Sequence, residues 1–163
     1  MNVTHKVAAA GIGIAVAVGM AAPANAETSA SSLDVRMSSF VADSRTSVLV
    51  SAELTQTQYA DISLDLTFEG FTASGTFAYR PGSCPSSLFR LNIPAAVFEC
   101  GWEQDGDDAR LRMAIKGTFP ATPIGVRVLR KGLTSPGEAG SYSVELSSWA
   151  LAPLTKSVKI KGR

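Results

Sequence analysis

The sequence predicts an all-β domain, an antiparallel β-sandwich of about eight or nine strands with one disulfide. Residues 61–69 alternate apolar and polar side chains without interruption, and side chains two apart lie on the same face of a strand. Weaker copies of this alternation follow, separated by short links rich in Gly, Pro, Ser and Asp. After residue 26, no stretch of about ten residues shows a helical pattern. Many short strands at this spacing are typical of a sandwich or a barrel.

The first 26 residues have the three parts of a secretory signal peptide. A short start with one lysine precedes an uncharged apolar run over 7–22, and Ala24-Asn25-Ala26 supplies a small-x-small cleavage site. The alternative is an uncleaved anchor, but sixteen weakly apolar residues are short for a span of about 20. We therefore expect cleavage before Glu27, a disordered lead-in over 27–32 and one domain over 33–163. The expected product is extracellular and has no membrane anchor.

The strands are predicted from the alternation of apolar and polar residues in chain order. Pro94 confines one of them, 88–94, to an edge or a loop. The predicted segments are 33–37, 48–54, 61–69, 76–79, 88–94, 96–102, 111–115, 124–128, 142–146 and 158–160.

Face assignments follow from the same alternation. In 61–69 the core face carries Ile62, Leu64, Leu66 and Phe68, and the polar residues face water. In the segments 76–79 and 96–102, Phe77 is expected to share a face with Tyr79, and Ala96, Phe98, Cys100 and Trp102 are expected to share another. Asp105-Gly106 has the composition of a tight hairpin turn between 96–102 and 111–115.

Cys84 and Cys100 are the two cysteines of the chain. An even pair in an exported domain is most simply a disulfide. Closing a loop of this length stabilises a fold by about 3 kcal/mol, mainly through the unfolded chain. The alternative, two free thiols or metal ligands, lacks other soft ligands to complete a site.

Charge and composition exclude several function classes. Without residues 1–26, the chain has 14 basic and 14 acidic side chains, so the net charge gives no attraction to nucleic acid or to anionic lipid. The single histidine, His5, leaves with the signal peptide. Histidine-dependent triads and histidine-ligated metals are then excluded, and we expect no cofactor.

The remaining catalytic motifs are also missing. The sequence contains no Ser-x-x-Lys, no Gly-x-Ser-x-Gly and no phosphate-binding glycine loop. A small secreted hydrolase that uses paired carboxylates stays open as an alternative. A second alternative is a protease inhibitor that inserts the turn cluster 80–85 as a rigid loop. The favoured interpretation is a non-catalytic binding module whose partner is an extracellular protein or a glycan.

Five aromatic residues are candidates for a stacking platform: Trp102, Trp149, Tyr59, Tyr79 and Tyr142. Trp102 is better explained as core packing against the disulfide, because it shares the predicted face of Cys100. Trp149 lies outside clear alternation, next to a proline-containing turn, which favours exposure. We take Trp149, Tyr59 and Tyr142 as the binding candidates.

Two charged clusters complete the list of candidate sites. Asp105, Asp107 and Asp108 are a fragment of a calcium-loop pattern, but the distal glutamate is missing. A solvated hairpin turn is the simpler interpretation. Arg127, Arg130 and Lys131 form a small basic patch that we interpret as a solvated face.

The stretch from Cys84 to the Asp105-Gly106 turn, with Phe98 and Trp102 beside the second cysteine, resembles immunoglobulin-like modules of exported bacterial surface proteins. The resemblance covers roughly residues 48–148 and implies an immunoglobulin-like sandwich. It also implies a structural, adhesive or binding role without catalysis. Those modules often occur as tandem repeats, whereas this chain has a single copy.

Overall fold

The computed structural model describes residues 30–54, 58–93, 96–119, 123–148 and 151–163. The predicted signal peptide, residues 1–26, lies outside this range. The described residues form twelve strands: β1 (Ala30–Met37), β2 (Val48–Leu54), β3 (Gln58–Phe68), β4 (Thr72–Ala73), β5 (Phe77–Pro81), β6 (Phe89–Leu91), β7 (Ala96–Asp105), β8 (Asp108–Phe119), β9 (Pro123–Val128), β10 (Leu133–Thr134), β11 (Gly140–Ser148) and β12 (Leu151–Ile160).

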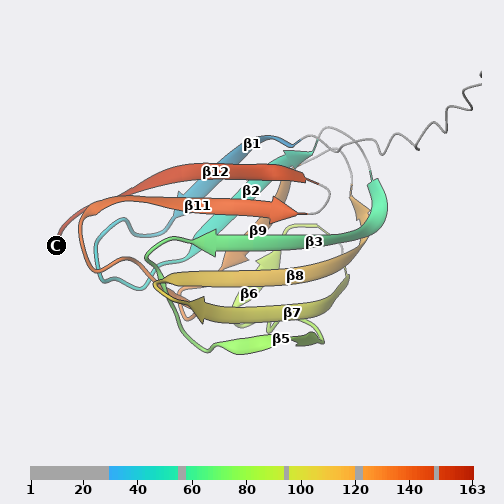
Figure 1. The fold of residues 1–163 in the computed structure, drawn as a ribbon, viewed down its shortest axis with the longest axis horizontal. Helices are drawn as coiled ribbons and strands as arrows, with labels where there is room; N and C mark the ends of the chain where they lie inside the picture. The colour runs from blue at the N-terminus through green and yellow to red at the C-terminus, as the bar shows by residue number, and fades with distance from the viewer. Residues whose placement is uncertain (1–29, 55–57, 94–95, 120–122, 149–150) are drawn as a thin grey trace, which may run out of the picture.

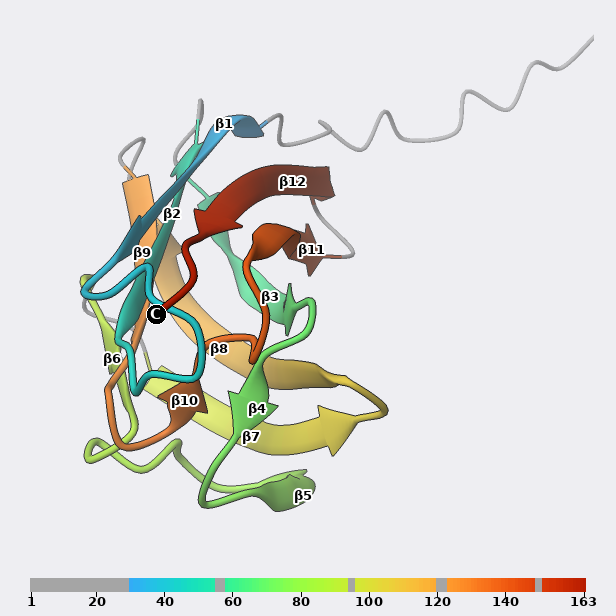
Figure 2. The same ribbon diagram turned by 90° about the vertical axis from the view of Figure 1, so that its left-hand side faces the viewer.

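The strands form two main antiparallel sheets that lie face to face. One sheet has the order β1-β2-β9-β6 and the other β12-β11-β3-β8-β7-β5. Figure 1 looks onto the six-stranded sheet, with the four-stranded sheet behind it, and Figure 2 shows the two layers from the side. The predicted all-β sandwich is confirmed, and β6 is an edge strand, as Pro94 indicated.

The core lies between the two sheets and contains the predicted apolar faces. β3 pairs with β8 along its whole length and with β11 on its other side. The buried side chains include Ile62, Leu64, Leu66 and Phe68 of β3, Leu111, Met113 and Ile115 of β8, Val48, Val50 and Ala52 of β2, and Ile124, Val126 and Val128 of β9. The face assignment for 61–69 is therefore correct, and in the other three strands the alternating apolar side chains are the buried ones.

The twelve strands exceed the expected eight or nine because two-residue strands lie in loops. β4 and β10 pair with each other as a separate small sheet, where the sequence predicted only links. β12 is also longer than the predicted 158–160, since it pairs with β11 from Leu151 to Ile160. β1 begins at Ala30, inside the stretch predicted as lead-in. Among the described residues, no helix is long and apolar enough to cross a membrane.

The disulfide and Trp102 occupy the predicted places. Cys84 and Cys100 are bonded, with 5.4 Å between their Cα atoms. Trp102 is fully buried, packs edge-on against Phe68 and Phe89, and donates from Nε1 to the Ser74 carbonyl at 3.0 Å. This hydrogen bond satisfies the buried indole. Trp102 is therefore a core residue.

Two face assignments were wrong, because each strand contains an irregularity. In β7 the register shifts between Val97 and Glu99, so Phe98 points outward and is 40% exposed. In β5 the register shifts between Phe77 and Arg80. Phe77 packs against the core, whereas Tyr79 is 39% exposed. A β-bulge adds one residue to a strand and so moves the next side chain to the opposite face.

Candidate functional site

The outer face of the six-stranded sheet carries the side chains that point away from the core. One of them is Tyr79, a large aromatic residue that is 39% exposed. β5 runs antiparallel to β7 and comes very close to it at Gly101, where a β-carbon would lie 2.6 Å from the Tyr79 Cα. Glycine is therefore required for this close approach of two backbones. Because of the irregularity in β5, the Tyr79 ring lies on the outer face and not between the sheets.

Two glutamates of β7 hold Tyr79 in place. The Tyr79 hydroxyl donates to Glu99 Oε2 at 2.5 Å, and the Tyr79 backbone N–H donates to Glu103 Oε1 at 3.4 Å. The hydrogen bond to Glu99, with smaller effects from burial and the Glu99 charge, raises the pKa of Tyr79 to about 12. The phenol thus stays neutral, and one edge of the ring is fixed while its remaining surface is open.

A row of charged side chains continues the site from Tyr79 across β8 to β3. Arg112 faces Asp65 across the β3–β8 pair, with 3.6 Å from Nε to Oδ1. Arg110 Nη1 lies 3.5 Å from Asp105 Oδ2. Among the buried polar side-chain atoms of the described residues, Asp65 Oδ1 and the Nε atoms of Arg110 and Arg112 have no hydrogen-bond partner. The ion pairs balance charge locally, but the hydrogen-bonding capacity of these groups is not used up.

These residues line two shallow depressions that lie side by side and share Arg112. Together they are called the Tyr79 groove below. The first has a volume of about 330 Å³ and is lined by Ser63, Leu64, Asp65, Tyr79, Arg110, Arg112 and Met113. The second has about 590 Å³ and is lined by Thr76, Phe77, Ala78, Trp102, Glu103, Gln104, Asp105 and Arg112. Both volumes are in the range of ligand sites.

The disulfide-braced turn lies beyond β5. The Gly82 N–H donates to the Phe98 carbonyl at 2.8 Å and the Leu88 N–H to the Pro85 carbonyl at 2.9 Å. The Gly82–Phe98 bond and the bridge from Cys84 to Cys100 attach the segment after β5 to β7, and the Leu88–Pro85 bond closes a turn within that segment. A depression of about 560 Å³ lies between this segment and residues 75–77. The disulfide therefore anchors the C-terminal side of the strand that carries Tyr79.

The three predicted binding aromatics lie away from the Tyr79 groove or outside the described residues. Tyr142 is half-buried in β11, donates from its hydroxyl to the Glu138 carbonyl at 3.1 Å, and covers Gly70, where a β-carbon would lie 2.8 Å from the ring. The backbone of Tyr59 pairs with Thr118, and its side chain lies outside the description. Trp149 lies outside the described residues. A binding role for these three stays a prediction.

The acidic turn is built as the predicted hairpin. Asp105 pairs with Asp108, and Gly106 has a φ of 61°, which suits glycine. Asp105 lies beside Arg110, and Asp108 Oδ1 accepts from the Gly70 N–H at 2.9 Å. In the part of the chain that the structure describes, no three His, Cys, Asp or Glu side chains are grouped to hold a metal ion. Calcium binding by Asp105, Asp107 and Asp108 stays a prediction.

Sequence reasoning did not single out the arginines of the Tyr79 groove. Arg110 and Arg112 alternate with Leu111 and Met113, and the face of Asp65 follows from the same rule. Tyr79 was placed on the wrong face. Gly101 within a strand pattern was the available signal, since glycine there often marks a close backbone approach.

Comparison with known proteins supports the fold without naming a family. No family model matches this chain, and no curated protein matches it. Among solved structures, the chain is similar to BslA, a bacterial hydrophobin, with 14% identity and a TM-score of 0.50 over 81% of this chain and 98% of that one. A non-cellulosomal cohesin from the hyperthermophilic archaeon Archaeoglobus fulgidus aligns with 9% identity and a TM-score of 0.34, over 80% of this chain and 91% of that one. The likeness to BslA extends over nearly all of that protein, so the sandwich of this chain is a fold already seen in a bacterial protein.

Proposed function

We propose that the protein is an exported, non-catalytic binding module and that the Tyr79 groove binds a neutral glycan. The observation that carries this proposal is the presentation of Tyr79 on the outer face, over Gly101 and fixed by Glu99. Irregularities of this kind redirect a side chain and are frequent next to functional sites. An exposed aromatic ring held in one orientation loses little entropy when a ligand stacks on it.

The chemistry of the groove favours a ligand rich in hydroxyl groups. Asp65 supplies acceptors and the two arginines supply donors. Because each of these charges already has an opposite charge nearby, an ionic ligand would have to displace an existing partner. A hydroxyl both donates and accepts, so it can bridge a carboxylate and a guanidinium without doing so. The apolar C–H face of a sugar ring would lie on Tyr79.

The sequence supports export and the lack of catalysis. Residues 1–26 have the pattern of a signal peptide, and no histidine follows them. The disulfide is of the kind retained in oxidising compartments. The resemblance to immunoglobulin-like modules of exported bacterial proteins agrees with a binding role. The likeness to BslA concerns the fold alone, so the ligand class is argued from the residues of this chain.

The proposal is tested by affinity electrophoresis and by pull-down of the exported protein with neutral polysaccharides such as cellulose, chitin and β-1,3-glucan. We expect one of them to retain the protein, and Tyr79→Ala to weaken retention by about tenfold, as loss of one stacked aromatic would. Phe98→Ala is the matched control, since Phe98 is equally exposed but does not line the groove.

Three results would contradict the proposal. If none of the neutral polysaccharides retained the protein, neutral glycans would be excluded as its ligands. Equal retention of wild type and Tyr79→Ala would exclude the groove. Release of soluble sugar during incubation would show that the protein is a hydrolase, which is the alternative with paired carboxylates.

A further inference from the structure

Three segments that are distant in sequence meet at one end of the sandwich. They are residues 38–47 between β1 and β2, residues 129–139 around β10, and residues 159–163 at the end of β12. The Ala42 N–H donates to the Lys161 carbonyl at 2.8 Å, the Asp43 N–H to the Pro136 carbonyl at 2.9 Å, and the Thr46 N–H to the Leu133 carbonyl at 3.0 Å. These segments are called the basic end below.

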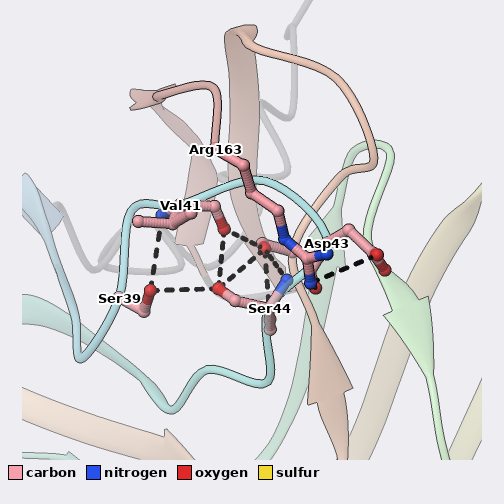
Figure 3. A network of polar contacts seen from close by, with 6 residues as sticks. Ser39, Val41, Asp43, Ser44 and Arg163 are labelled. Carbon is pink, nitrogen blue, oxygen red and sulfur yellow. Dashed lines mark hydrogen bonds and ion pairs between the residues drawn. The ribbon is translucent and has the colours of Figure 1, made fainter.

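Side-chain hydrogen bonds brace the basic end, as Figure 3 shows. The Ser44 hydroxyl donates to the Val41 carbonyl at 2.6 Å, and the buried Ser135 hydroxyl donates to the same carbonyl at 2.7 Å. Arg163 Nη2 donates to the Asp43 carbonyl at 2.8 Å. The loop 38–47 is therefore held from both sides, so its surface side chains are presented by a fixed backbone.

The basic end concentrates positive charge in a chain whose net charge is only +1. Six exposed cations lie on its segments: Arg45, Arg130, Lys131, Lys159, Lys161 and Arg163. Only two acidic residues lie on the same segments, Asp43 and Glu138. One of them, Asp43, is already paired with Arg163 at 3.4 Å. The small net charge of the whole chain conceals this local excess of cations.

Two exposed apolar side chains lie on the same segments. Phe40 is 41% exposed and Val41 38% exposed; in the part of the chain with described side chains, only two other large apolar side chains are this exposed, Tyr79 and Phe98. Val41 forms a parallel bridge with Lys161, which places a cation directly beside it. Exposed apolar residues on segments rich in cations are the pattern of proteins that bind an anionic lipid surface.

We propose that the basic end docks on an anionic membrane surface. Phe40 and Val41 enter the boundary between headgroups and acyl chains, and the surrounding lysines and arginines contact lipid phosphates. An anionic polymer would use the cations equally well but would gain nothing from exposed Phe40 and Val41. The apolar pair therefore favours lipid. This inference is independent of the Tyr79 groove, which lies on the face of the six-stranded sheet.

The test is co-sedimentation of the exported protein with phosphatidylglycerol–phosphatidylcholine vesicles, compared with pure phosphatidylcholine vesicles. We expect binding to the anionic vesicles only, and weaker binding as salt is raised. The double variant Phe40→Ser/Val41→Ser and the double variant Arg130→Glu/Lys131→Glu should each weaken binding by about tenfold or more. Lys116→Glu is the matched control. Lys116 is exposed and lies near the C-terminal end of β8, outside the three segments of the basic end, so its replacement should leave vesicle binding unchanged.

Each variant is first shown to retain the wild-type melting temperature, which the exposure of all five substituted side chains predicts. Equal binding to neutral vesicles would overturn the proposal, as would equal weakening by Lys116→Glu. Binding to soluble polyphosphate or duplex DNA that is unaffected by Phe40→Ser/Val41→Ser, without vesicle binding, would identify the basic end as a polyanion site instead.

Discussion

A β-carbon on Gly101 would lie 2.6 Å from the Cα of Tyr79 and 2.7 Å from its backbone nitrogen. Neither neighbour is the flexible end of a side chain, so the two strands would have to separate. Gly101→Ala is therefore expected to destabilise the protein by about 1–3 kcal/mol, as overpacking does. Tyr79 should also be displaced from the groove. Urea denaturation measures the first effect, and glycan retention the second.

Gly137→Ala is the matched control for this substitution, because no atom lies within 4 Å of a β-carbon built on Gly137. We expect it to be neutral or slightly stabilising. Similar losses of stability in both variants would mean that the contact between β5 and β7 is looser than described.

The disulfide is expected to contribute both stability and the position of β5. It spans 16 residues, and replacing Cys84 and Cys100 together by serine should lower the free energy of unfolding by about 3 kcal/mol. Since the bridge anchors the segment after β5, glycan retention should fall as well. Thermal melting in the absence of reductant gives the first quantity. An unchanged melting temperature would mean that the bridge is dispensable.

The Tyr79–Glu99 hydrogen bond predicts an unusual titration. One of the three tyrosines of the chain, Tyr79, should ionise near pH 12, because deprotonation would lose its hydrogen bond to Glu99. A raised folded-state pKa means that this contribution to stability is complete below pH 10 and is lost as the pH rises through 12. The ultraviolet absorbance of tyrosinate reports the titration.

Glu99→Gln should bring the pKa of Tyr79 back toward its ordinary value, since the acceptor is no longer charged. Glu103→Gln is the control, because Glu103 contacts only the Tyr79 backbone. If Glu99→Gln left the late titration in place, the hydrogen bond between Tyr79 and Glu99 would not be its cause.

Regular alternation made the core predictable, and local irregularity made the site unpredictable. The faces of β3 and β8 followed from period two, because their pairing has no register shift. Phe98 and Tyr79 were misassigned, because one extra residue reverses every following side chain. No sequence motif around Phe98 or Tyr79 marks the position of the β-bulge.

The basic end was hidden from the sequence for a different reason. Its charges come from three segments separated by up to about 120 residues, as the bond between Arg163 and Asp43 illustrates. Only the fold brings these segments together. Arg130 and Lys131 were recognised as basic, but the sequence did not show that they share one end of the sandwich with Lys161 and Phe40, so they were interpreted as a solvated face.

The core face of β3 is tested by placing a charge first on the face that points into the core and then on the face that points outward. Leu64 is 2% exposed, and Leu64→Asp should destabilise the protein by on the order of 4 kcal/mol or prevent its folding, because the carboxylate has no partner in the core. Thr67→Asp is the control, since Thr67 faces outward between Arg110 of β8 and Glu145 of β11, whose opposite effects on a new carboxylate offset each other. It should change stability by less than about 0.5 kcal/mol. Secreted yield and urea denaturation distinguish the two.

The hydrogen bonds between Ser143 and Glu69 predict a small loss of stability at acidic pH. The Ser143 hydroxyl and backbone N–H each donate to Glu69 Oε2 at 2.7 Å, and these bonds, the hydroxyl first, lower the pKa of Glu69. A lowered folded-state pKa means that the stabilisation is present above the ordinary value of 4.5 and is lost as the pH falls through the lowered value. The carboxylate is exposed, so the effect should be roughly 0.5 kcal/mol or less.

Glu69→Gln removes this titration, so the stability difference between wild type and variant should shrink as the pH is lowered from neutral to about 3. Ser143→Ala removes one of the two donors to Glu69, so it should remove part of the pH dependence of stability. The double variant completes the cycle, since two residues in direct contact should show non-additive losses. Additive losses at neutral pH, or a difference that grows in acid, would show that the contact between β3 and β11 at Glu69 does not stabilise the fold.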